Sequence, residues 1–185
     1  MKGVVFTEFL ELVETAFSPE VADAIIARAD LPSGGAYTAI GTYDHAEILA
    51  LVAELSKETG APIPTLVHTF GRHLFGRFLL HYPQFFAVPT AFEFLERVHG
   101  YIHVEVRKLY PDAELPSFEY ARPDPDTLVM IYRSHRPFAD LAAGLIDAAI
   151  EHWGGGITVA REPLDEPGRT AVRFTLTRQS RALAS

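Results

Sequence analysis

The sequence predicts an α+β fold in which a run of helices precedes a small antiparallel sheet. Up to residue 110, apolar residues recur at helical spacing between proline and glycine breaks, and after Pro111 they alternate with a period of two. Helices first and strands afterwards are typical of an α+β domain. The 185 residues suit one domain, and their 48% apolar content suffices for a large core with an apolar cavity.

Four helices are expected before residue 82. Ser18 followed by Pro19 is an N-cap with proline at the first helical position, and Gly60 ends the third helix. Residues 31–42 contain one proline and three glycines, so this stretch is predicted to be irregular. The four helices are predicted over residues 3–17, 19–28, 45–59 and 65–81.

The segment from Thr90 to Glu93 is a capping box, so a fifth helix begins there and runs to Tyr110. Pro111 ends this helix because proline cannot continue it. Residues 179–185 are predicted to be a loose tail. Strands are predicted over residues 118–121, 127–134, 157–161 and 170–177, the last two as a hairpin, with one helix over 137–152.

Composition excludes several classes of function. A formal charge of −8 without a basic block opposes binding to nucleic acid or to an anionic membrane. The absence of cysteine excludes disulfides, iron–sulfur clusters, cysteine-ligated zinc and thiol catalysis. Glu8, Glu11 and Glu14 exclude a secretory signal, and no apolar run reaches the ~18–20 residues that span a bilayer. A cytoplasmic location is expected.

His103 lies in an apolar helical stretch beside Ile102 and allows three interpretations. It could be an ordinary core residue. It could bind zinc together with His99 in a hydrolytic metalloenzyme, but zinc normally needs a third protein ligand, for which Glu96 is a weak candidate. It could also bind haem iron, since one histidine in an apolar wall suffices when the porphyrin supplies the other four nitrogens.

Tyr132, Ser134 and Arg136 are spaced at the strand period of two. In an extended segment all three side chains point to one side, where a phenol, a hydroxyl and a guanidinium converge. The arginine fork matches a carboxylate, and each hydroxyl can donate once, so haem propionates would satisfy this group. Two simpler interpretations are a polar strand edge and a Ser134 that only caps the helix starting near Pro137.

With these residues, the sequence resembles the haem–nitric oxide/oxygen binding (H-NOX) domains, bacterial relatives of the haem sensor domain of soluble guanylate cyclase. The resemblance covers nearly the whole chain. It is carried by Met1-Lys2-Gly3, Phe70-Gly71-Arg72, the segment from His103 to Phe118, and the Tyr-x-Ser-x-Arg motif at residues 132–136.

The resemblance implies a haem b cofactor (iron protoporphyrin IX) buried between two lobes of a single domain. Residues 1–63 would form a helical distal lobe, and residues 64–178 a proximal lobe with the sheet. His103 would be the axial iron ligand, and Pro116 would press on the porphyrin and distort it. The propionates would be held by Tyr132, Ser134 and Arg136.

The resemblance also implies which gas is bound. Relatives that bind oxygen carry a tyrosine hydroxyl over the iron, and the matching position here is Leu141. The distal wall is expected to be apolar and to consist of Val5, Phe9, Leu74, Phe78, Leu141 and Leu145. A donor to polar oxygen is worth about 1–3 kcal/mol, whereas nitric oxide depends much less on one.

Nitric oxide, with carbon monoxide as a further ligand, is therefore expected rather than oxygen, although an oxygen sensor of the same fold stays an alternative. A shift of the alignment by one residue would replace Leu74 with His73 and bring a donor into the wall. Neither an effector domain nor catalysis is expected in this chain, so the output is expected in trans. Among relatives, the usual partner is a sensor histidine kinase or a cyclic-di-GMP enzyme.

Overall fold

The computed structural model describes residues 1–179 and confirms the predicted α+β fold, while residues 180–185 of the expected tail lie outside the described residues. None of the helices among residues 1–179 is long and apolar enough to cross a membrane. The first elements are α1 (Gly3–Ala16), α2 (Pro19–Arg28), α3 (His45–Thr59), α4 (Ile63–His81) and the 3₁₀ turn η1 (Pro83–Phe86). They are followed by α5 (Ala91–Arg97), the π turn η2 (Val98–Ile102), α6 (His103–Leu109), β1 (Ser117–Asp124), β2 (Thr127–Ser134), α7 (Ala139–His152), β3 (Ile157–Leu164) and β4 (Thr170–Arg178).

The four strands form one antiparallel sheet in the order β1-β2-β4-β3. Strands β3 and β4 pair as the predicted hairpin. Strand β2 buries alternate residues, Leu128, Met130 and Tyr132, because its side chains point in turn to the core and away from it. Tyr132 lies between Phe118 on β1 and Val172 on β4, which fixes it in the middle of the sheet.

The predicted helix from Thr90 to Tyr110 begins and ends where expected but is not one regular α-helix. The Thr90 hydroxyl accepts the Glu93 backbone N–H at 3.2 Å, so the predicted cap is confirmed. Between α5 and α6, however, the five residues of η2 are wound as a π-helix. The backbone N–H of His103 consequently bonds to the carbonyl of Val98, five residues earlier, and His103 opens a new helix.

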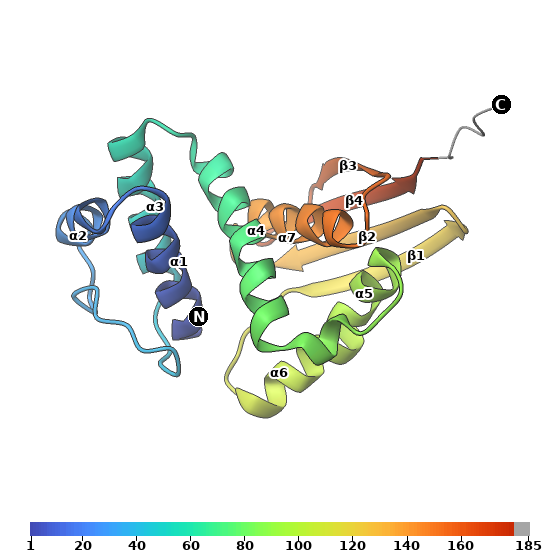
Figure 1. Cartoon of the computed structure of the whole chain (residues 1–185), viewed down its shortest axis with the longest axis horizontal. Coiled ribbons are helices and arrows are strands. Elements are labelled where there is room, and N and C mark those ends of the chain that lie inside the picture. The colour runs from blue at the N-terminus through green and yellow to red at the C-terminus, as the bar shows by residue number, and fades with distance from the viewer. Residues whose placement is uncertain (180–185) are drawn as a thin grey trace.

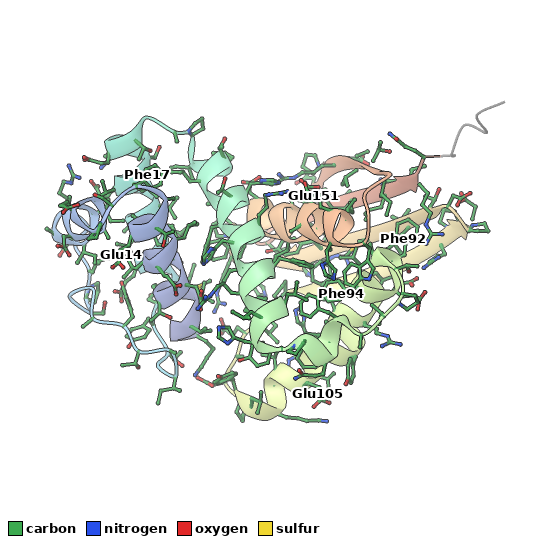
Figure 2. The ribbon with its side chains drawn as sticks, viewed as in Figure 1. Glu14, Phe17, Phe92, Phe94, Glu105 and Glu151 are labelled. Atoms are coloured by element: carbon green, nitrogen blue, oxygen red, sulfur yellow. The ribbon has the colours of Figure 1, made fainter. Side chains whose placement is uncertain are left out.

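The molecule has two apolar cores that share helix α4. One core is built from α1, α2, α3 and the first part of α4, and the other from the sheet, α5, α7 and the second part of α4. Figure 1 shows α4 standing between the N-terminal helices and the sheet. Phe92 and Phe94 of α5 belong to the second core (Figure 2). Their side chains pack in the space between α5, the sheet and α7. Phe78 of α4 packs against both cores.

Helices α4 and α7 touch backbone to backbone at two glycines. A Cβ atom on Gly144 would lie 2.0 Å from the carbonyl oxygen of His68, and one on Gly71 would lie 2.3 Å from that of Leu141. Only glycine permits such an approach, because any Cβ would overlap the facing main chain. On the outer side of the contact, His68 Nε2 lies 2.8 Å from a carboxylate oxygen of Asp147.

Replacing Gly144 with alanine should therefore push α7 away from α4. We expect Gly144→Ala to lower the free energy of unfolding by about 1–3 kcal/mol, measured by urea denaturation followed by circular dichroism. Gly76→Ala is the matched control, because this glycine of α4 is exposed and nothing lies within 4 Å of its Cβ position. The control should raise stability by about 0.5–1 kcal/mol. Equal effects of the two substitutions would contradict the close contact.

Candidate functional site

A cavity of about 340 Å³ lies where the two cores meet. This volume falls in the range of small-molecule and cofactor sites, and most of the lining is apolar, as in such sites. The lining includes Val5, Leu74, Phe78, His103, Pro116, Tyr132, Ser134, Arg136, Leu141 and Leu145, which are all predicted site residues. The structure thus brings together side chains from α1, α4, α6, α7, β2 and the segment before β1.

Phe9 is the predicted site residue that the lining leaves out. Its ring packs edge-on against Phe70, with 5.3 Å between the ring centroids, in the core of the N-terminal helices. It is 1% exposed and stands one helical turn beyond Val5, which does line the cavity. Phe9 therefore supports the wall from behind in this structure.

His103 is a neutral imidazole in the cavity wall. Burial, first, and then the charges of His99 and Arg107 lower its pKa to about 4, while the backbone of Pro116 acts weakly in the opposite direction. Its Nδ1 atom is buried without a well-aligned hydrogen-bond partner among residues 1–179. At neutral pH the ring is therefore uncharged and keeps a free lone pair, the form in which histidine binds metals.

Glu96, the candidate third ligand of a zinc site with His99 and His103, is paired with Arg122. The Glu96 carboxylate accepts two hydrogen bonds from the Arg122 guanidinium, at 2.8 and 2.9 Å. Within the described part of the chain, no three His, Asp or Glu side chains gather as a metal site. The two histidine rings stand 6.3 Å apart on their own, so this pair does not form a zinc site of the usual kind.

The three alternating polar residues Tyr132, Ser134 and Arg136, at the end of β2, all line the cavity. Burial raises the pKa of Tyr132, and the neighbouring Ser134 hydroxyl and Arg136 charge partly oppose this rise. The Ser134 hydroxyl also accepts the Arg136 backbone N–H at 3.0 Å. Arg136 donates to the backbone carbonyl of Glu114 at 3.0 Å and pairs with the Glu114 carboxylate. This clamp therefore already holds a carboxylate, the group that a propionate would present.

His73, the residue before Leu74, does not bring a hydrogen-bond donor into the cavity. His73 Nε2 lies 3.3 Å from a carboxylate oxygen of Glu8, and Arg77 Nε lies 2.6 Å from the same oxygen. These contacts join α4 to α1, and none of the three residues is in the cavity lining. What remains of the predicted wall is apolar and consists of Val5, Leu74, Phe78, Leu141 and Leu145, called here the apolar wall.

A polar cluster that the sequence did not reveal lies in the lining of the cavity. Lys2 Nζ donates to the Thr42 hydroxyl at 2.7 Å, and Thr42 donates to Asp112 at 2.8 Å. Lys2 also forms an ion pair with Asp112 at 3.3 Å and stands 5.1 Å from the centre of the Tyr110 ring. This cluster, called here the clasp, links the N-terminal helices to the loop after α6. Its partners are up to 110 positions apart, and only Lys2 in the opening motif hinted at it.

The family described as "Haem-NO-binding" matches residues 2–161 of the chain. The chain belongs to this family, the H-NOX domains. The predicted resemblance is therefore confirmed, and so is haem as the cofactor. A search among curated proteins gave no match.

Solved H-NOX structures share the fold over nearly all of the described residues. The Fe(II) unliganded protein from K. algicida is 38% identical, with 100% of both chains covered and a TM-score of 0.91. The Fe(II)CO protein from Shewanella woodyi bound to IWP-051 is 39% identical, with 98% and 96% covered and a TM-score of 0.83. A mutant H-NOX from T. tengcongensis is 21% identical, with 96% and 97% covered and a TM-score of 0.87, and shows the fold alone.

The side chains of the cavity fit a haem. An apolar cavity suits the porphyrin face, the uncharged His103 suits an iron ligand, and Arg136 with two hydroxyls suits the propionates. The arginine pairs with the exposed carboxylate of Glu114, and a propionate in the cavity would take the place of that carboxylate. These assignments rest on the chemistry of the donors present.

Loosening the clasp should let haem leave faster. We expect Asp112→Ala to speed haem transfer to a haem-free acceptor protein by about two- to fivefold, because a part-exposed ion pair contributes up to ~1 kcal/mol. Asp165→Ala is the matched control, because this aspartate lies exposed in the β3–β4 turn and its loss changes the net charge equally. The assignment of the clasp as a closure of the cavity fails if both variants release haem at the wild-type rate.

Proposed function

We propose that this protein is a haem sensor selective for nitric oxide, with His103 as the proximal iron ligand. The observation that carries the proposal is the combination, in one cavity, of an uncharged buried imidazole, a carboxylate clamp and an apolar wall. Membership of the H-NOX family supports a sensor that binds haem. The gas preference and the ligand rest on the residues of this chain.

When bound, haem supplies an iron site for diatomic gases. His103 holds that iron through a neutral nitrogen, since its pKa of about 4 keeps the ring unprotonated at cellular pH. Tyr132, Ser134 and Arg136 orient the group by its carboxylates. Pro116 shares the cavity lining with His103 and would press on the bound group.

The apolar wall decides the choice of gas. Retention of oxygen needs a hydrogen-bond donor that is worth about 1–3 kcal/mol, and no side chain of the wall can donate. His73, the polar neighbour of Leu74 in the sequence, contacts Glu8 of α1 and does not line the cavity. Nitric oxide binds without such a donor, and carbon monoxide does so as well, so both are proposed ligands and oxygen is rejected.

The signal is proposed to pass through the helix that carries His103. Loss of the bond that His103 would make to the bound group would free α6, which His103 opens, to move away from the cavity, and Pro116 would lose its contact with that group. The N-terminal helices then shift against the sheet, and a partner protein reads the change. The partner is proposed to be a sensor histidine kinase or a cyclic-di-GMP enzyme that meets this protein in the cytoplasm.

The ferrous absorption spectrum tests the proposal directly. We expect an intense Soret band, a marked change on addition of nitric oxide, and no stable oxygen complex in air. A stable spectrum of the oxygen-bound protein would favour the oxygen sensor instead. Absence of any Soret band after expression with haem supplied would remove the sensor altogether and revive a role for His99 and His103 without haem.

Removal of the His103 side chain should remove haem. We expect His103→Gly to purify without haem unless imidazole is present during expression, because free imidazole can enter the space and supply the missing nitrogen. The measurement is the ratio of Soret to protein absorbance. His81→Gly is the control, since this histidine is exposed at the end of α4, and it should keep its haem. Retention of haem with unchanged spectra in His103→Gly would exclude His103 as the ligand.

A donor placed in the apolar wall should admit oxygen. We expect Leu141→Tyr to slow oxygen dissociation at least about fivefold, measured by stopped-flow mixing, because its hydroxyl would donate to the gas. Leu141→Phe is the matched control, since it adds the ring without the hydroxyl. If Leu141→Phe has the same effect as Leu141→Tyr, ring size rather than hydrogen bonding controls the site.

A further inference from the structure

The π turn before His103 leaves one backbone amide to be bound from outside the helix. In an α-helix, the N–H of His99 would bond to the carbonyl of Leu95. Here the N–H of Val98 bonds to that carbonyl, and the N–H of His99 donates to the phenol oxygen of Tyr120, 3.4 Å away. A side chain that enters the ladder of a helix in this way stabilises an irregular winding.

Tyr120 reaches the π turn from strand β1 as part of an aromatic row. Its ring lies parallel to that of Phe118, with centroids 6.3 Å apart and 15° between the planes. Phe118 in turn contacts the ring of His103 at 5.9 Å and that of Tyr132 at 5.6 Å. One face of β1 therefore touches the turn, the histidine and the clamp.

The hydroxyl of Tyr120 can accept the hydrogen bond of the His99 amide over a wide range of pH. Burial raises its pKa to about 12, the His99 amide slightly opposes this rise, and Glu96 adds to it. The hydroxyl therefore stays neutral across the cellular range of pH and can accept the N–H throughout. Tyr101, by contrast, belongs to the π turn itself and is 44% exposed.

We propose that Tyr120 is a positioning residue for His103. The Tyr120 hydroxyl holds the π turn and thereby sets the direction of the His103 imidazole. The inference rests on the proposed role of His103 as the iron ligand. A π turn contains one residue more than an α turn, so its relaxation would shift the following residues by one position. That shift corresponds to about 100° of rotation and ~1.5 Å of rise, enough to take His103 out of the cavity wall.

Tyr120→Phe tests this assignment in the full chain loaded with ferrous haem, because it removes the hydroxyl and keeps the aromatic row. We expect the His99 amide to exchange with solvent roughly two- to tenfold faster, as expected for one lost hydrogen bond. We also expect the iron–histidine stretching band in the Raman spectrum to shift. Tyr101→Phe is the matched control from the π turn and should change neither measurement.

The possible results separate the two proposals. Unchanged amide exchange and an unchanged band in Tyr120→Phe overturn the positioning role. Loss of unfolding stability with an unshifted band also overturns it, because Tyr120 would then serve only the fold. If the iron–histidine band of the wild type persists in His103→Gly, or if the wild type has no such band, His103 is not the iron ligand. In that case the exchange rate of the His99 amide still decides whether Tyr120 holds the π turn.

Discussion

The contact of two helix backbones at Gly71 and Gly144 is the constraint on which the remaining structure depends. Helix α4 belongs to both cores, and α7 covers one face of the sheet, so this contact fixes the sheet relative to the N-terminal helices. It also fixes the cavity. Each helix contributes two residues to the apolar wall, and a wider separation would change the shape of the space that these four side chains line.

The cavity separates its polar groups from its apolar ones in a way that suits a flat amphipathic cofactor. The arginine and hydroxyls of the clamp lie at the end of β2, where Arg136 can exchange one carboxylate for another. His103 lies among apolar neighbours, where a charged imidazole would be costly. The same low polarity that keeps His103 uncharged would, under the proposed function, also deprive oxygen of a donor.

The sequence predicted what local patterns determine and missed what the tertiary structure imposes. The caps at Ser18 and Thr90 and the buried alternation of β2 were predictable, because each depends on a few neighbouring residues. The π turn was not, since its outside partner Tyr120 comes from a strand 21 positions away from His99. The contact of His73 with Glu8 on another helix was not predictable either, because spacing along α4 alone cannot show it.

The clasp suggests how a local change at His103 can reach the N-terminal helices. His103 begins α6, and Asp112 follows shortly after that helix ends at Leu109, so a displacement of α6 is expected to move Asp112 with it. Asp112 is bound by Lys2 and Thr42, which belong to the N-terminal part of the chain. Further along α1, the buried Glu8 contacts His73 and Arg77 of α4 and so ties the two helices together. If α6 moves as proposed, the N-terminal helices would receive the displacement at one end while α4 restrains them further along, and a rotation about α4, rather than a simple translation, is the expected response.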